Sequence, residues 1–316
     1  MSQYKYDILS CGLAVCDIIA SPLDRTVFEV DTAYLKDINY SSGGDALNVA
    51  VACAKMGAEV AMGGSIGKDM PGDFLCKKAN EAGIDTSFLT RLDNAGTATS
   101  LIFGESSGER HFAYYPGANL LFDGENITDE ILSQTKLIYI GSAMALGSLD
   151  GEPLANLFCR AKKLGVTTAM DATSSTDGVW LPKIEKALCH TDIFIPSVYE
   201  GSNIFGTENP EQIYKSLKAY GVKIAGVKLG KEGVYVEGNY IPAFECERVV
   251  DTTGAGDCFM AAFCNAYIKG EDVIGCSLIG SAASNFCIRK TGATTGIPQY
   301  EDIKALADKY KNKLFN

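Results

Sequence analysis

The sequence predicts an α/β protein with a mostly parallel central sheet and helices on both of its faces. Apolar runs of strand length alternate with segments of helical spacing along most of the chain, which is the pattern of successive β-then-α units. Two runs near residue 100 break this rhythm and predict a second, smaller sheet. No repeat, low-complexity tract or Pro/Gly/Ser linker divides the 316 residues, so we expect one domain over 1–316.

The strands of the main sheet are expected where short apolar runs end at a glycine, an aspartate or a proline. These runs are 6–12, 59–66, 137–141, 166–171, 192–196 and 224–230, followed by a short hairpin at 234–241. Gly12, Gly141, Asp171, Pro196 and Gly230 fall at strand ends. Because ligands of such sheets bind beyond the carboxyl ends of the strands, these positions predict one functional rim.

Helices are expected where apolar residues recur at helical spacing between these strands. The first predicted helix follows Gly44 and ends at Gly57, and the second begins at Pro71 and ends near Gly83. Further helices are predicted over 152–164, 182–188 and 210–220, and three more finish the chain. Gly12 begins a loop that is expected to carry Asp17, and 20–40 is mixed and weakly periodic. The runs 97–103 and 110–115 alternate around a polar turn at 105–109, which is typical of a hairpin outside the main sheet.

Composition excludes several classes of protein. The net charge of −11 and the pI near 4.8 argue against a nucleic-acid surface. No tract of 18 apolar residues predicts a membrane span, and residues 1–7 lack the basic and apolar regions of a secretory leader. The eleven cysteines are scattered without a C-x-x-C pair, so we expect free thiols in a reducing cytoplasm. Two histidines leave little for a zinc site.

The stretch 251–259, DTTGAGDCF, is the strongest candidate site. Gly254 and Gly256 lie at the start of a predicted helix, whose first N–H groups lack intrahelical partners and can bind an anion such as phosphate. Asp257 falls in the same first turn. It either complements the helix dipole, an effect of about 0.3–1 kcal/mol, or acts as a base beside a bound phosphoryl group.

Two other phosphate motifs are excluded. Met62 stands where the first glycine of a Walker A loop ending at Gly67-Lys68 belongs, and Asp69 replaces the required Ser or Thr. Met62 also removes the first glycine of a G-x-G-x-x-G dinucleotide motif.

With these residues in view, the chain resembles the ribokinase-like (PfkB) carbohydrate kinases. DTTGAGDCF is similar to the C-terminal signature of that family, and further motifs match it in order and spacing. They are Gly43-Gly44 with Asn48, Gly67-Lys68-Asp69 with Gly72-Asp73-Phe74, Gly117-Ala118-Asn119, 196–200, and Gly230 with Gly233. The resemblance implies a three-layer α/β/α domain with a small β-sheet lid, and an ATP-dependent kinase that acts on an alcohol.

The resemblance also implies a role for particular residues. Gly254, Ala255 and Gly256 correspond to the anion hole and Asp257 to the general base. Asp17, Gly43, Gly44 and Asn48 correspond to the acceptor-binding set, and Lys228, Gly230 and Gly233 to the nucleotide site. Glu200 corresponds to a glutamate that helps to hold Mg²⁺, here through water, and Asp251 and Thr253 to a site for a monovalent cation such as K⁺.

Parts of 14–40 and 95–118 correspond to the family's lid, which excludes water from the reaction. Many relatives pair through this lid, so a homodimer is expected. Phe112, Tyr114 and Tyr115 are interpreted either as packing within the lid or as contacts to the substrate.

Departures from the ribokinase motifs bear on the substrate. Val15 replaces an asparagine and Asp45 a lysine of the acceptor motifs, and no glutamate lies near 141–145. A site built from hydrogen bonds discriminates strongly, so these changes favour a ketohexose or a keto-deoxy sugar acid over ribose. Two further departures concern the nucleotide and the metal: Lys228 stands where relatives often carry Thr or Ser, and Ser197 replaces the asparagine of an N-x-x-E element. A nucleoside or pseudouridine kinase is the alternative, and a non-catalytic ligand-binding protein on the same fold is the remote one.

Overall fold

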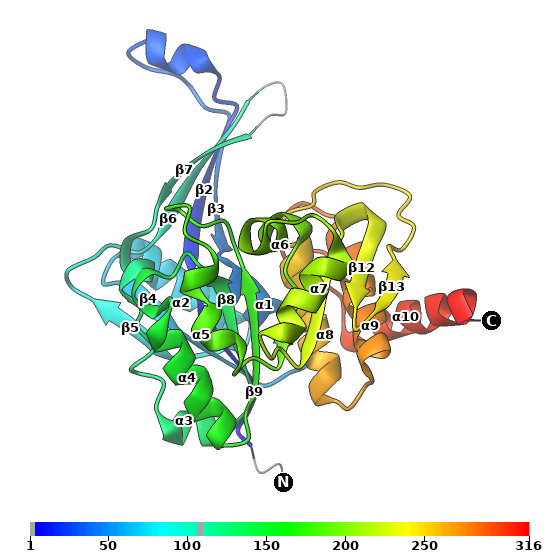
Figure 1. The fold of residues 1–316 in the computed structure, drawn as a ribbon. Coiled ribbons are helices and arrows are strands. Elements are labelled where there is room, and N and C mark those ends of the chain that lie inside the picture. Colours follow the sequence, from blue (N-terminus) through cyan, green and yellow to red (C-terminus); the bar gives the residue numbers. More distant parts are fainter. Residues whose placement is uncertain (1–3, 106–109, 316) are drawn as a thin grey trace.

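The computed structural model describes residues 4–105 and 110–315, and within them nine strands form a central sheet (Figure 1). The strand pairs from β11 to β5 are parallel, and β12 and β13 add an antiparallel edge. Across the sheet the strands are β13 (Asn239–Pro242), β12 (Gly233–Val236), β11 (Ile224–Lys228), β10 (Ile193–Phe194), β9 (Thr167–Ala172), β8 (Thr135–Ala143), β1 (Tyr6–Gly12), β4 (Val60–Gly67) and β5 (Asp85–Leu92). The predicted α/β fold is confirmed.

Helices cover both faces of this sheet, and each face has its own apolar core. One face packs against α1 (Asp45–Lys55), α2 (Met70–Glu81), α8 (Ala255–Ile268), α9 (Val273–Cys287) and α10 (Tyr300–Phe315). The other packs against α3 (Asp129–Ser133), α4 (Glu152–Lys163), α5 (Glu185–Leu188), α6 (Val198–Phe205) and α7 (Pro210–Ala219). Successive strand residues point to opposite faces, so Ile8 enters the first core and Leu9 the second. Each is fully buried, which stabilises the fold by about 1.5–3 kcal/mol per side chain.

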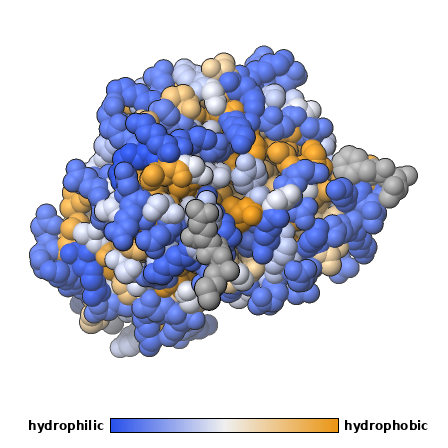
Figure 2. Space-filling view, turned by 90° about the horizontal axis from the view of Figure 1, so that it is seen from below, coloured by the Kyte–Doolittle hydropathy of each residue, from blue (hydrophilic) through white to orange (hydrophobic). Residues whose placement is uncertain are grey.

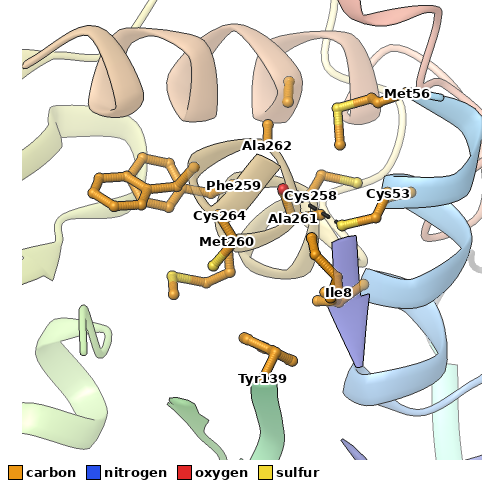
Figure 3. Close-up of a cluster of buried hydrophobic side chains, with 14 of the residues drawn as sticks. Ile8, Cys53, Met56, Tyr139, Cys258, Phe259, Met260, Ala261, Ala262 and Cys264 are labelled. Carbon is orange, nitrogen blue, oxygen red and sulfur yellow. Dashed lines mark hydrogen bonds between the residues drawn. The ribbon is translucent and has the colours of Figure 1, made fainter. Parts of the chain in front are cut away.

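The first core fixes α8, the helix that carries DTTGAGDCF, against the sheet. Figure 3 shows Cys258, Ala261 and Ala262 of α8 gathered with Ile8 of β1 and Cys53 of α1. The thiol of Cys53 donates to the carbonyl oxygen of Ala261 at 3.5 Å. Small side chains let α8, α1 and the strands approach closely, so the start of α8 has a fixed position.

Among the elements that the sequence did not predict are β5 and α6, and each has a physical reason. The edge strand β5 alternates polar and apolar residues only weakly. Helix α6 is short, but Ser197 and Glu200 form a capping box at its start, in which each side chain accepts a hydrogen bond from the other residue's backbone N–H. The S-x-x-E spacing was a signal for this helix.

A second sheet projects from the central one (Figure 1). Its strands, in spatial order, are β3 (Asp37–Gly43), β2 (Val15–Ser21), β6 (Thr99–Gly104) and β7 (Arg110–Tyr115). The expectation of a loop at Asp17 was wrong, because Asp17 lies within β2. Residues of β3 are largely exposed, which removes the apolar periodicity that would reveal this strand. The hairpin turn predicted at 105–109 lies outside the described residues except for Glu105.

The described surface offers no membrane-spanning element. Seen from below, it is mainly hydrophilic with small hydrophobic patches toward its middle (Figure 2). No helix in 4–105 or 110–315 is both long and apolar enough to cross a bilayer. All eleven cysteines are free thiols, as the sequence predicts.

Candidate active site

The site is built around the first turn of α8. Gly254 has a φ of 76°, a left-handed conformation that favours glycine. A Cβ atom added to it would lie 2.5 Å from the carbonyl oxygen of Ala293. That oxygen also accepts from the thiols of Cys258 (3.1 Å) and Cys287 (3.2 Å), which fixes the neighbouring segment. No side chain caps this helix start, so its first N–H groups are available to an anion.

Asp257 lies in this turn and contacts α1. Its Oδ2 accepts a hydrogen bond from Nδ2 of Asn48 at 2.7 Å. Burial raises the pKa of Asp257 well above its ordinary value, and the negative charge of Asp45 raises it further. A carboxylate of raised pKa is a stronger base, which suits proton abstraction from an alcohol near neutral pH.

Asp17 and the two glycines that precede α1 form a second group. A Cβ atom at Gly43 would lie 2.3 Å from Oδ2 of Asp17, so only glycine leaves room for this carboxylate. Gly44 has a φ of 91°, and a Cβ atom there would meet the carbonyl oxygen of Leu13 at 2.5 Å. Burial raises the pKa of Asp17 to about 6, with no charged neighbour contributing. The predicted acceptor residues therefore meet where β2, β3 and α1 converge.

The second sheet completes this group. Asp17 is in register with Ser100, and Ser100 with Tyr114, so the three share one face. Burial raises the pKa of Tyr114, and the charges of Asp45 and Asp17 raise it further. The amide of Asn119 donates to the carbonyl oxygen of Ala14 at 3.1 Å and lies 3.5 Å from the Tyr114 hydroxyl. Tyr114 is therefore a candidate contact for the acceptor.

Asp45 also belongs to the site, a position that the sequence marked only as a departure from the ribokinase motif. Its carboxylate accepts a hydrogen bond from the hydroxyl of Ser142. Ser142 has a φ of 65°, a strained conformation for a residue other than glycine. Burial raises the pKa of Asp45, and Glu200 contributes to the same shift. No sequence signal pointed to Ser142.

A cavity of about 420 Å³ lies beside the start of α8. The predicted nucleotide residues Lys228, Gly230 and Gly233 line it, together with Ala255 and Gly256 of the predicted anion hole. Its other walls come from α8 itself through Phe259, from the segment before α8 and from α9 with its C-cap. Sequence reasoning missed the residues of the last two groups, which include Phe244, Val249, Ser281, Ser284, Asn285 and Ile288. Apolar walls with a few amide and hydroxyl groups are typical of small-molecule sites.

Lys228, which lines this cavity, belongs to a buried ion pair. Nζ of Lys228, at the end of β11, pairs with Oδ2 of Asp171, at the end of β9. Their side chains are 14% and 6% exposed. Lys228 is the one neighbour within 4 Å of a Cβ atom built on Gly256, with Nζ at 3.6 Å. Burial lowers the pKa of Lys228, but Asp171 and Glu200 outweigh it and raise the pKa above its ordinary value. The lysine therefore carries its charge beside the anion hole.

The residues predicted for metals are already engaged. Oε2 of Glu200 accepts a hydrogen bond from the backbone N–H of Ser197 at 2.6 Å. The charge of Glu200 raises the pKa of Asp171, Asp45 and Lys228. These hard oxygen donors are of the kind that Mg²⁺ prefers, with water completing its shell. Within 4–105 and 110–315, no group of three or more His, Cys, Asp or Glu residues has the geometry of a metal site. The magnesium role of Glu200 stays a prediction.

Asp251 and Thr253 lie just before α8. Oδ1 of Asp251 accepts from the backbone N–H (3.0 Å) and the hydroxyl (2.7 Å) of Thr253, and Oδ2 accepts from the N–H of Gly292 at 3.1 Å. Burial opposes ionisation, but these hydrogen bonds outweigh it and lower the pKa of Asp251. Arg110 of β7 lies 3.6 Å from Oδ2 and links the second sheet to this segment. The monovalent-cation site also stays a prediction.

Comparison with known proteins agrees with this geometry. The family model described as pfkB family carbohydrate kinase matches residues 5–300. Among curated proteins, the chain is 28% identical over 313 residues to an ATP-dependent 6-phosphofructokinase of Thermoanaerobacterium thermosaccharolyticum, covering 96% of this chain and 94% of the relative. It is 27% identical over 328 residues to a 5-dehydro-2-deoxygluconokinase of Shouchella clausii, covering 96% of each.

Among solved structures, a ribokinase of Thermotoga maritima is similar with a TM-score of 0.80 and 25% identity, over 96% of this chain and 99% of that one. The family match covers nearly the whole chain. The chain therefore belongs to the pfkB family of carbohydrate kinases.

Proposed function

We propose that this kinase transfers the γ-phosphoryl group of ATP to a hydroxymethyl group of a small sugar or sugar derivative, with Asp257 as the general base. One observation carries the proposal. The start of α8 lies between the nucleotide-sized cavity, which Ala255 and Gly256 line, and the acceptor group, which Asn48 joins to Asp257. A phosphoryl group bound there would meet amide N–H groups on one side and a base on the other.

The transfer itself needs little covalent chemistry from the protein. The acceptor oxygen forms a bond to the γ-phosphorus as the bond from that phosphorus to the ADP oxygen breaks, and the hydroxyl proton passes to Asp257. The N–H groups of the first turn stabilise the charge on the transferred group. Glu200 would help to hold Mg²⁺ through water, and the ion would supply further neutralisation of the phosphates of ATP.

The side chains around the acceptor group support an uncharged acceptor. Asp17 and Asp45 offer hydrogen-bond acceptors to hydroxyl groups. No Lys or Arg contributes to the pKa shift of Asp17, and the one cation that acts on Asp45 is Lys228, which Asp171 already pairs. A carboxylate or phosphate on the substrate would be repelled there, which favours a ketohexose over a keto-deoxy sugar acid within the proposed class.

The second sheet is proposed to act as a lid and as the surface of a homodimer in the cytoplasm. Large apolar side chains on it are exposed, including Ile38 (52%), Tyr40 (58%), Leu101 (40%) and Phe112 (64%). Exposed patches of this kind mark interaction sites in soluble proteins. The free thiols support a reducing compartment.

A coupled assay of ADP release tests the function directly. The panel contains D-fructose, D-tagatose, 2-keto-3-deoxygluconate, D-ribose, adenosine and pseudouridine, with ATP and Mg²⁺. We expect turnover with a ketohexose to exceed turnover with the sugar acid and with ribose. A nucleoside as the best acceptor would select the alternative function.

The variant Asp257→Asn tests the role of Asp257 as a base while leaving the shape of the binding site unchanged. The amide keeps the shape and the contact to Asn48 but cannot take the proton, so turnover should fall by about 10²–10⁴-fold. ADP affinity measured by calorimetry should stay unchanged. An Asn variant with full turnover would remove Asp257 from the mechanism.

A further inference from the structure

The ion pair between Lys228 and Asp171 has a position that nucleotide binding alone does not explain. A lysine that only holds a nucleotide phosphate would be expected to be exposed, as Lys231 of the same cavity is. Lys228 also lines the cavity, but its side chain is only 14% exposed. Its Nζ is 3.6 Å from the point where a side chain would begin on Gly256.

The backbone around Lys228 is held from two sides. Its N–H donates to the carbonyl oxygen of Pro196 at 2.7 Å, and Lys228 forms a parallel bridge with Ser197. Asp171 reaches the ammonium group from β9, across the intervening strand β10. The charge is therefore fixed in place before any ligand arrives, as preorganised catalytic electrostatics requires.

The charges around it explain why a cation belongs at this point. Four carboxylates act on the pKa of Lys228 or of one another, namely Asp45, Asp171, Glu200 and Asp257. Among the described residues, Lys228 is the cation whose charge opposes the raised pKa of Asp45, Asp171 and Asp257. A phosphoryl group that enters this acidic surrounding needs a positive charge on its path to the acceptor.

We propose that Lys228 is a catalytic residue that contacts the transferred phosphoryl group, and that Asp171 is the positioning residue that holds its ammonium group. The inference rests on the proposed kinase function. Lys228 stays protonated throughout: the proton of the acceptor goes to Asp257, while the ammonium group stabilises the phosphoryl oxygens as the bond to ADP breaks.

The test compares variants of the full-length enzyme by turnover, by the KM for ATP and by ADP affinity, using the acceptor that gives the highest turnover in the panel. Because Lys228→Met alone leaves Asp171 buried without a partner, the main variant is the double change Lys228→Met with Asp171→Asn. Its kcat should fall by about 10²–10³-fold, the usual effect of removing one stabilising donor. Its ADP affinity and KM for ATP should stay near those of the wild type.

A second ion pair provides the matched control. Lys162 pairs with the buried Asp192, which precedes β10 at the opposite ends of the strands and far from the cavity lining. The double change Lys162→Met with Asp192→Asn removes a similar pair and should leave kcat unchanged. An equal loss of kcat in this control would show that any such pair matters only for the fold, and would overturn the proposal.

Three single variants keep the inference testable if the double variant does not fold. Lys228→Arg preserves the charge and the pair, and should retain clearly more turnover than Lys228→Thr, which supplies only a hydroxyl. Asp171→Asn should lower kcat without raising the KM for ATP. Equal turnover of the Arg and Thr variants, or a loss confined to the KM for ATP, would contradict the catalytic role.

The controls also separate this inference from the proposed function. A wild-type enzyme that releases no ADP with any acceptor in the panel would refute the function itself. An active wild type with an equally active double variant would refute only the role of Lys228.

Discussion

The variant Gly256→Ala tests whether Gly256 is required for ligand binding rather than for the stability of the fold. Gly256 is the second residue of α8 and does not have a positive φ, so alanine fits its backbone. An added Cβ atom would meet only Nζ of Lys228, at 3.6 Å, which is an ordinary contact. Replacing a glycine under these conditions stabilises a protein by about 0.4–1 kcal/mol. For a chain of 316 residues this is a rise in Tm of roughly 1–2 °C.

The same methyl group should nearly abolish activity. It would occupy the space between the Lys228 ammonium group and the first turn of α8, which is where the phosphoryl group is proposed to bind. Loss of one oxyanion-hole contact typically lowers kcat by about 10²–10³-fold, and we expect at least that effect. The measurements are thermal unfolding of the free enzyme and the coupled assay of ADP release.

Gly254→Ala is the contrasting variant. At a φ of 76°, alanine carries a strain of about 1–2 kcal/mol, and its Cβ atom would collide with Ala293 at 2.5 Å. Overpacking of this kind costs about 1–3 kcal/mol more. We therefore expect Gly254→Ala to lose both stability and activity, and Gly256→Ala to lose activity alone. Full activity of the stable Gly256→Ala enzyme would refute the proposed position of the phosphoryl group.

Three further predictions concern groups around the reaction centre. The pKa of Asp17 is about 6 in the folded protein against an ordinary 3.8, so the folded state binds the proton more tightly and loses stability as the pH rises through this range. Asp17→Asn should therefore unfold at a higher temperature than the wild type at about pH 7.5 and lose this advantage near pH 4. A difference in unfolding temperature that stays the same at both pH values would contradict the raised pKa of Asp17. If Asp251 helps to hold a monovalent cation, replacing K⁺ by choline should lower the turnover of the wild type but not that of Asp251→Ala. A wild type whose turnover does not depend on K⁺ would contradict this role of Asp251. Leu101→Glu puts a charge on the exposed second sheet and should convert the proposed dimer into monomers in sedimentation. A wild type that is already monomeric would contradict the proposed dimer.

Much of the site could be predicted because its chemistry is local in the sequence. The glycines, the helix start and Asp257 lie within nine consecutive residues, so their physical properties and their family resemblance are both visible in one stretch. The alternation of strands and helices is equally local, and it predicted the parallel sheet. Asp17 was placed in the acceptor group by its motif, although β2, the strand that carries it, was missed because its residues do not alternate between apolar and polar.

The sequence alone determined the fold class and the family, and it predicted the position of the anion hole, because all three depend on short-range patterns. Only the tertiary structure decided which distant charges meet there. Asp171 and Lys228 lie 57 positions apart, and Asn48 and Asp257 lie 209 apart. Such pairs depend on the order of the strands and on the packing of α1 against α8. No periodicity records them, because parallel strands bring together residues that the chain separates by whole helices.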